Sequence, residues 1–163
     1  MAVKRISINW VAKLNDSKDL PKYGDSGDGK FSKKFGQGRF VIPAPLEVDA
    51  LMIKVPKGKL TTINKLLAAL FKKHKTDFAC PITTGIFSWI AAHAADEMAR
   101  QGRKHISPYW RTLKSDEEIN PKYPGGIEAI REKLEAEGHT VIQKGKRFLV
   151  ADFEKKTIVP KLK

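Results

Sequence analysis

The spacing of apolar residues predicts two helices in the middle of the chain. Residues 46–55 place four apolar side chains at helical spacing before a Pro-Lys-Gly-Lys run ends the element: Val48, Leu51, Met52 and Val55. From Ile63 to Phe71 the apolar residues recur at i, i+3, i+4, i+7 and i+8, which is typical of an amphipathic helix. Thr61 or Thr62 is suited to cap its first turn. We expect this helix to carry lysines on its outer side.

A third helix is expected from about Ile82 to Ala99, and it carries two different stripes of side chains. Large apolar residues form the stripe expected to face the core: Ile82, Ile86, Trp89, Ile90 and Met98. Small residues form the second stripe: Thr84, Ser88, Ala91 and Ala95. A minor groove about 6 Å wide accepts a helix only where the facing side chains are tiny. A small stripe equally allows close helix packing, so both interpretations stay open.

The flanking segments have weaker patterns. Residues 1–45 are rich in Lys, Asp, Gly and Ser, which favours an extended, partly flexible basic arm pinned by aromatic side chains (Trp10, Phe31, Phe35 and Phe40). A further helix is expected from Ile127 to a C-terminal cap at Gly138. The residue pattern of positions 139–163 predicts a β-hairpin and a tail, both packed on the same domain. The fold class is therefore mainly α with small β hairpins, an α+β fold.

Charge indicates the kind of partner. The 163-residue chain has a formal net charge of +13, which favours a polyanion such as nucleic acid. Residues 50–76 hold seven lysines and no acid, residues 98–114 hold five basic residues and no acid, and residues 115–137 hold seven acids against three basic residues. This segregation predicts a basic face, although lysine runs more often form solvated helix faces.

Several function classes find no support in the sequence. There is no long uncharged apolar run and no signal-peptide pattern, so we expect no membrane partner and a cytoplasmic location, nucleoid-associated in a bacterial cell. The single cysteine, Cys80, excludes an internal disulfide and a multi-cysteine zinc site. His93 lacks metal-ligand spacing, and the glycines form no phosphate-binding fingerprint. We therefore expect neither a metal nor a cofactor.

Residues 106–126 contain the most distinctive local chemistry. The cluster Pro108-Tyr109-Trp110-Arg111 places two rings beside a guanidinium, and the segment closes on a glycine pair, Gly125 and Gly126. Such rings can stack on a nucleobase, and glycines let a backbone approach closely. Buried aromatic anchors followed by an ordinary turn are the commoner arrangement.

The order of these segments resembles the DNA-binding domain of the O6-alkylguanine-DNA alkyltransferase family. The resemblance covers about residues 46–138 and is carried by residues 55–62 (VPKGKLTT), 108–112 (PYWRT), 123–127 (YPGGI) and 134–138 (LEAEG). It implies a winged-helix domain of helix-turn-helix type that enters the minor groove and flips an alkylated guanine into a pocket. The repair enzymes of the family present a Pro-Cys-His-Arg motif whose cysteine accepts the alkyl group irreversibly.

The motif departs from the family at its chemical centre. Tyr109 stands in place of the acceptor cysteine and Trp110 in place of its histidine, so Glu137, which matches the family's supporting glutamate, would have no histidine to orient. A phenol with a pKa of about 10 is a poor nucleophile here, and indole cannot relay a proton. The ordinary alternative for Glu137 is a solvent-facing acid in the last turn of a helix. The resemblance is thus to the non-enzymatic alkyltransferase-like proteins, which bind alkylated DNA and signal to repair.

The resemblance also assigns the residues of a DNA interface. The family's phosphate-rotating tyrosine is replaced by Ile63, and Gly85 or a neighbouring threonine stands where an intercalating arginine belongs. The implied lesion pocket comprises Pro108, Tyr109, Trp110, Arg111, Tyr123, Pro124, Gly125 and Gly126. The implied DNA contacts are Lys57, Lys59, Thr61, Thr62, Lys65, Lys72, Lys73, Thr83, Thr84, Gly85, Ser88, Arg100, Arg103 and Lys104.

The function predicted from the sequence is non-enzymatic binding of double-stranded DNA, with O6-alkylguanine as the candidate lesion and a repair-pathway protein as the candidate partner of a monomer. Two alternatives remain. Cys80 precedes the small-residue helix, where a thiol pKa can fall, so it is a candidate alkyl acceptor, although a small buried role is commoner. The same fold could instead serve as a protein-interaction module.

Overall fold

The computed structural model describes residues 9–162, and residues 1–8 of the expected arm lie outside it. The helices in this range are α1 (Trp10–Asn15), α2 (Lys30–Phe35), α3 (Pro45–Ile53), α4 (Ile63–His74), α5 (Pro81–Arg100), α6 (Gly126–Ala136) and α7 (Phe153–Lys156), with a 3₁₀ helix η1 (Tyr109–Arg111). The strands are β1 (Lys22–Asp25), β2 (Arg39–Ile42), β3 (Thr61–Thr62), β4 (Phe78–Ala79), β5 (Thr112–Leu113), β6 (Val141–Lys144) and β7 (Arg147–Val150). This mixture confirms the predicted α+β class.

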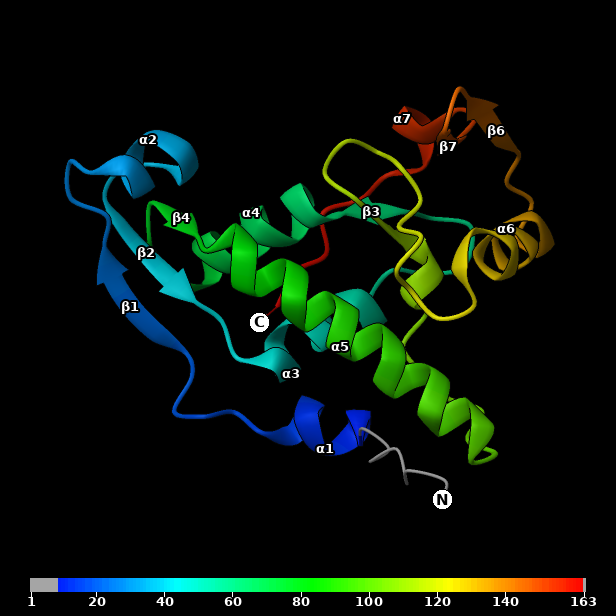
Figure 1. Ribbon diagram of the computed structural model, residues 1–163, viewed down its shortest axis with the longest axis horizontal. Coiled ribbons are helices and arrows are strands. Elements are labelled where there is room, and N and C mark those ends of the chain that lie inside the picture. The colour runs from blue at the N-terminus through cyan, green and yellow to red at the C-terminus, as the bar shows by residue number, and fades with distance from the viewer. Residues whose placement is uncertain (1–8, 163) are drawn as a thin grey trace, which may run out of the picture.

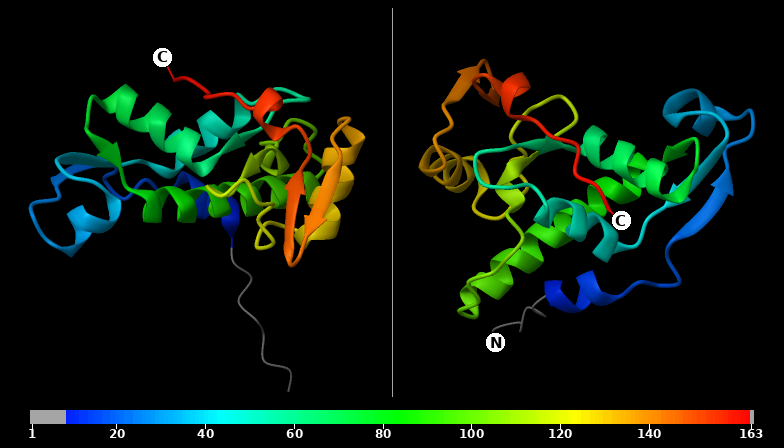
Figure 2. Two further views of the ribbon diagram at one scale, coloured as in Figure 1. Left: turned by 90° about the horizontal axis from the view of Figure 1, so that it is seen from above. Right: turned by 180° about the vertical axis from the view of Figure 1, so that it is seen from behind.

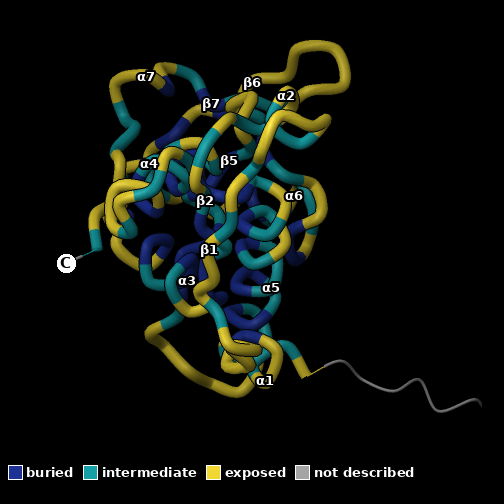
Figure 3. Tube along the Cα trace, turned by 90° about the vertical axis from the view of Figure 1, so that its left-hand side faces the viewer, coloured by how far each residue is buried: buried dark blue, intermediate teal, exposed yellow. Residues whose placement is uncertain are grey.

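Helix α5 runs through the middle of the molecule (Figure 1). It is 20 residues long, and α1, α3, α4 and η1 all contact it. Figure 3 shows the buried residues gathered along α3 and α5, whereas β1 is mostly exposed. The core is therefore built by helices that pack around one long helix.

The predicted core stripe of α5 is confirmed only in part, because Trp89, Ile90 and Met98 pack against the core but the first two members of the stripe do not. Ile82 and Ile86 are 51% and 46% exposed, whereas the small residues of the second stripe are buried: Thr84, Ser88, Ala91 and Ala95. Small side chains let the backbones of neighbouring helices approach α5 closely, and this close packing decides which stripe faces inward. The small stripe thus serves helix packing.

Helix α4 forms as predicted. The Thr62 hydroxyl oxygen accepts a hydrogen bond from the backbone N–H of Lys65 and so caps the first turn. Leu66 and Leu70 are fully buried, and Lys72 is exposed on the other side. The Pro-Lys-Gly-Lys run at 56–59 lies between α3 and β3, as expected for a helix-breaking segment.

The N-terminal segment contains short regular elements where an extended chain was predicted. Strand β1 pairs antiparallel with β2, and β2 pairs parallel with β4. Trp10 anchors α1 on α5, because its ring stacks on His93 at 4.5 Å and its backbone N–H donates to Glu97. The rings of Phe31, Phe35, Phe40 and Phe78 form a cluster beside this sheet. The expected aromatic anchoring is thus present in the described residues.

The C-terminal hairpin is confirmed. Strands β6 and β7 pair antiparallel, with Lys144 opposite Arg147 at the turn. The chain then returns across the molecule, and Ile158 donates a backbone hydrogen bond to Leu60 (Figure 2). The division into an arm, a winged-helix domain and a C-terminal unit stays a prediction. Across residues 9–162 we find no helix with the length and hydropathy needed to cross a bilayer.

Candidate nucleic-acid interface

The cluster around η1 is held by the carboxylate of Glu137. The indole Nε1 of Trp110 donates to Glu137 Oε2 at 2.8 Å, and the Arg111 guanidinium donates to both carboxylate oxygens at 2.7–3.1 Å. Arg111 also donates from Nη1 to the carbonyl oxygen of Val55, just beyond α3. The backbone N–H of Gly58 completes the set. These bonds connect η1, α6 and the segment after α3.

The environment of Glu137 excludes the alternative that this residue faces solvent. Its side chain is 7% exposed. Burial by itself would raise the pKa of Glu137, but the hydrogen bonds from Arg111 and Trp110 outweigh it and hold that pKa below the ordinary value. The carboxylate therefore binds an indole N–H where the family motif has a histidine, and Arg111 braces the cluster.

The rings expected to line a lesion pocket are themselves buried. Tyr109 and Tyr123 are each 3% exposed, and their ring centroids lie 6.2 Å apart in an edge-on arrangement. The Tyr123 hydroxyl donates to Ser88 of α5. Burial raises the pKa of each phenol to about 12. These two rings fill the space between η1 and α5 and stay protonated at neutral pH.

The backbone conformation of the turn before α6 requires the two glycines that the sequence places there. Gly125 and Gly126 have φ values of +80° and +69°, which other residues rarely adopt. A Cβ on Gly125 would also collide with Ala129. The backbone N–H of Gly126 donates to the Tyr123 carbonyl oxygen, and Pro124 is buried. The described contacts thus give this turn a structural role in starting α6.

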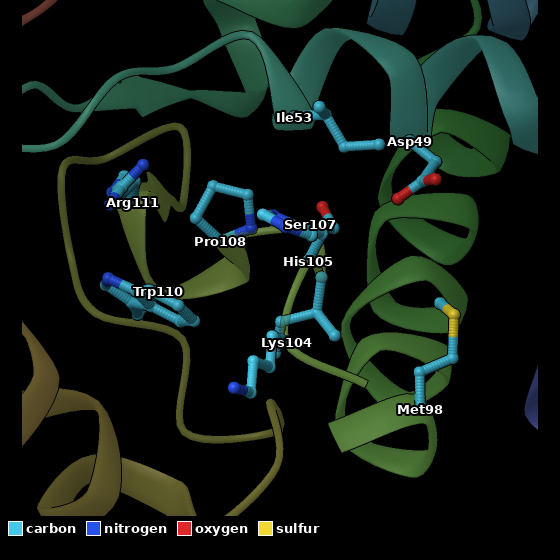
Figure 4. Close-up of a pocket in the computed structure, with 10 residues that line it drawn as sticks. Asp49, Ile53, Met98, Lys104, His105, Ser107, Pro108, Trp110 and Arg111 are labelled. Carbon is cyan, nitrogen blue, oxygen red and sulfur yellow. The ribbon is translucent and has the colours of Figure 1, made fainter. Parts of the chain in front are cut away.

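A cavity of about 630 Å³ lies between α3, the end of α5 and the segment that leads into η1 (Figure 4). Its apolar lining includes Ile53, Met98, Pro108 and Trp110. Pro108, Trp110 and Arg111 are therefore the predicted pocket residues that line a real cavity, whereas Tyr109, Tyr123, Pro124, Gly125 and Gly126 are not among those that line it.

Two polar side chains in this cavity were not predicted from the sequence. Asp49 is 8% exposed and Ser107 is 2% exposed, and Asp49 Oδ1 and Ser107 Oγ are closed off from solvent. Burial raises the pKa of Asp49, and the neighbouring Ser107 hydroxyl opposes this rise only partly. The sequence did hold a signal, because Asp49 interrupts the apolar face formed by Val48 and Met52.

The N-terminal half of α5 presents a mixed surface. Ile82 and Ile86 are exposed with Gly85 between them, and they line a shallow cavity of about 420 Å³ with Trp89 and Lys122. Thr83 is half-buried on the same turn. This surface lies beside the turn that leads to α6, because Trp89 donates to the Lys122 carbonyl oxygen.

Several predicted DNA contacts are not on the surface. Thr84 and Ser88 of α5 are buried, and so are Thr61 and Thr62 of β3. The Thr61 hydroxyl donates to the carbonyl oxygen of Ile158. Burial removes these four side chains from any surface that DNA would meet.

The predicted basic residues are mostly exposed but lie in separate places. Exposed side chains include Lys57, Lys59, Lys72, Lys73, Arg100, Arg103 and Lys104, and Lys65 is half-buried. Lys73 pairs with Glu47 at 3.0 Å, and Arg100 pairs with Asp96. Arg100 lies in the last turn of α5, a helix about 30 Å long, whereas Lys72 and Lys73 lie in the last turn of α4.

Cys80 is buried at the residue before α5 and is 6% exposed. Its backbone N–H donates to the carbonyl oxygen of Val41 in β2. This position fits the small structural role that the sequence favoured. Within the described range, no group of three or more His, Cys, Asp or Glu side chains could hold a metal ion.

Comparison with solved structures identifies one informative neighbour, S. pombe Atl1 in complex with damaged DNA containing O6-carboxymethylguanine. The chain shares its fold. The TM-score is 0.51 at 15% sequence identity, over 71% of this chain and 94% of the Atl1 chain. No family model and no curated protein matches the sequence. The likeness to Atl1 supports the alkyltransferase-like fold that the ordered motifs indicated.

Proposed function

We infer that this protein binds double-stranded DNA of the kind that Atl1 binds, without performing chemistry on it. The observation that carries this inference is the fold shared with Atl1, whose structure is a complex with damaged DNA. The net charge of +13 supports a polyanionic partner. Among lesions, O6-alkylguanine is the candidate that the motifs at 108–112 and 123–127 favour. Binding would mark the lesion for a repair-pathway protein.

The chemistry at η1 supports a non-enzymatic role. Tyr109 occupies the position that the resemblance gives to the acceptor cysteine, and a buried phenol with a pKa of about 12 remains neutral and weakly nucleophilic. Trp110 binds Glu137 through an N–H that cannot shuttle protons. The protein would therefore recognise DNA and release it unchanged.

The exposed beginning of α5 is the surface that we assign to the DNA. Ile82 and Ile86 project from the N-terminal half of this helix, and apolar side chains of this kind can act as wedges between base steps in the minor groove. Such an apolar side chain would replace the intercalating arginine that the resemblance places near Gly85 and that this sequence lacks. Exposed lysines elsewhere would contact phosphates, which position a protein without reading sequence.

The direct test is binding to labelled duplexes over a range of salt concentrations. We expect affinity to fall steeply with added salt, because phosphate contacts release counterions. Competition between a plain duplex and one that contains O6-methylguanine tests the lesion preference, and at least tenfold tighter binding to the second supports it. A flat salt response, or no binding at low salt, contradicts the proposed function.

The alternative of alkyl transfer to Cys80 has its own test. Incubation with the O6-methylguanine duplex followed by intact-mass measurement should show no added methyl group. A methyl adduct that disappears in Cys80→Ala would replace the binding model with an enzymatic one. The burial of Cys80 argues for the first outcome.

A further inference from the structure

A groove of about 570 Å³ lies between the second half of α4 and the C-terminal tail formed by residues 159–162. The tail runs along α4 on the side away from α5 (Figure 2). The groove shares no lining residue with the cavity beside η1 or with the shallow cavity at the beginning of α5. It is therefore a separate feature of the surface.

The walls of the groove are apolar. Phe71 on α4 is 36% exposed and Val159 on the tail is 44% exposed. The apolar lining continues through smaller or partly covered residues: Ala68, Ala69, Pro160 and Leu162. Apolar side chains that adjoin one another at the surface leave favourable burial unused, and such patches are typical of binding sites.

Lysines surround these apolar walls. No acidic residue lines the groove, whereas four lysines do: Lys72, Lys73, Lys75 and Lys161. The Lys73 ammonium pairs with Glu47 at 3.0 Å, but the other three make no ion pair within residues 9–162. Like charges around one groove repel one another, so an anionic occupant is favoured there. The occupant must combine negative charge with an apolar group.

The tail also offers unused backbone hydrogen bonds. Ile158 still donates a backbone hydrogen bond, but the N–H groups of Val159 and Lys161 have no acceptor within residues 9–162. The chain has no helix or turn here, and alternate N–H groups of an extended chain point to the same edge. Pro160 between them has no N–H. A second extended chain can pair with such an edge.

These three features together favour a peptide over other anions. A DNA duplex offers phosphates to lysines, but it presents no apolar side chain to Phe71 and Val159. A fatty acid would cover the apolar walls, but its single carboxylate cannot pair with three separate ammonium groups. An acidic peptide supplies several carboxylates, an apolar side chain and backbone carbonyl oxygens for the tail.

We propose that the groove between α4 and the C-terminal tail binds an extended acidic segment of a partner protein. A large apolar side chain of that segment packs against Phe71 and Val159. Carboxylates on both sides of this anchor pair with the unpaired lysines of the groove: Lys72, Lys75 and Lys161.

This assignment goes beyond the proposed DNA binding and does not depend on it. The resemblance implies a DNA contact for Lys72, whereas the groove places this lysine beside an apolar surface. The tail and α5 lie on opposite sides of α4 (Figure 2). A peptide in the groove therefore leaves the surface at Ile82 and Ile86 open to DNA.

The test is fluorescence anisotropy of the full chain with a dye-labelled peptide in which aspartates and glutamates flank a central phenylalanine. We expect saturable binding. Replacement of the phenylalanine by serine removes the apolar contact, and replacement of the acids by their amides removes the ion pairs. Each change should weaken binding at least tenfold. No binding of the first peptide, or equal binding of all three, would overturn the proposal.

Matched variants locate the binding site. Val159→Asp places a negative charge on the apolar wall and should weaken peptide binding at least tenfold, whereas Ile142→Asp alters a residue of β6 that is 36% exposed and should not. Lys161→Glu should also weaken binding, whereas Lys144→Glu makes the same charge change at the end of β6. All four side chains are exposed, so the melting temperatures should match the wild type. Equal losses within each pair would indicate attraction to net charge alone and overturn the proposal.

Addition of duplex DNA to the peptide complex separates the two surfaces. Peptide affinity that is unchanged at saturating duplex supports a groove distinct from the DNA surface. Displacement of the peptide by duplex, with duplex affinity lowered by Val159→Asp and by Lys161→Glu, would assign the groove to DNA and overturn the proposal. Peptide binding by a protein without affinity for duplex would keep the groove and remove the DNA-binding function.

Discussion

Trp110 and Glu137 are joined by a hydrogen bond of 2.8 Å from the indole Nε1 to Oε2. The indole thus takes the place that the resemblance gives to a histidine, and the glutamate keeps a buried partner. Arg111 completes the cluster through a bidentate ion pair with the same carboxylate. The three side chains form a structural clamp between η1 and the end of α6.

Removal of the carboxylate should destabilise the fold strongly. Glu137→Gln leaves the half-buried Arg111 guanidinium without its counter-charge, and breaking such a pair costs about 3–5 kcal/mol in the free energy of unfolding. Urea denaturation measures this loss. Glu135→Gln on the same helix breaks only the exposed pair with Arg131 and should leave the urea midpoint nearly unchanged. Equal effects of the two substitutions would contradict a buried clamp.

The same clamp predicts a dependence on pH. The pKa of Glu137 in the folded protein lies below its ordinary value of 4.5, so the unfolded chain takes up this proton at a higher pH than the folded one. The stabilisation is fully present above about pH 4.5 and is lost as pH falls through the lower folded pKa. The difference in free energy of unfolding between wild type and Glu137→Gln should be constant near neutral pH and shrink below about pH 4.5. A difference that grows on acidification would contradict this sign.

Much of the fold could be predicted because its signals are local. Helix α4 has a threonine cap and one apolar face, and both are visible within 12 residues of sequence. Helix α5 was located correctly, but its small residues are more buried than its large apolar stripe, of which Ile82 and Ile86 are exposed. Periodicity separates two faces without saying which one a neighbour will cover, and close approach of α1, α3 and α4 favoured the small residues.

The site was harder to predict because its contacts are distant in sequence. Glu137 meets a donor 27 residues away, and Asp49 meets Ser107 only because α3 packs beside the segment that enters η1. No local pattern encodes such a meeting. The aromatic cluster stays a predicted functional candidate, and packing places Tyr109 in the core and Trp110 in a cavity wall.

Close packing of the small stripe can be tested by enlarging one of its residues. Ala91 is fully buried on α5. Ala91→Leu adds three carbons to a filled interface, which should lower the free energy of unfolding by about 1–3 kcal/mol. Ala99→Leu near the end of α5 is exposed and serves as the control. A neutral result for Ala91→Leu, measured by thermal denaturation, would mean that this stripe has free space.

Asp49 should reduce stability at neutral pH. Its pKa in the folded protein is raised by burial, so the ionised form is disfavoured by folding and the cost is present above that raised pKa. Asp49→Asn removes the charge with little change of shape and should raise the free energy of unfolding at pH 7 by about 0.5–2 kcal/mol. The gain should vanish at low pH, where Asp49 is protonated in both states. Urea denaturation of the wild type and of Asp49→Asn at pH 7 and at about pH 3 provides the comparison. If Asp49→Asn were less stable than the wild type at pH 7, the ionised carboxylate would have to make a stabilising interaction in the folded protein.

The exposed face of α5 gives the sharpest test of where DNA binds. Ile86 is 46% exposed, so Ile86→Asp should change the free energy of unfolding by less than about 0.5 kcal/mol. It places a negative charge on the surface assigned to the minor groove, and duplex affinity should fall at least tenfold at low salt. Leu46→Asp provides a matched control, because Leu46 on α3 is also 46% exposed and lies on another element. Fluorescence anisotropy with a labelled duplex measures both variants. An equal loss for the two would indicate a general effect of net charge, whereas a loss confined to Leu46→Asp would move the DNA-binding surface from α5 to α3.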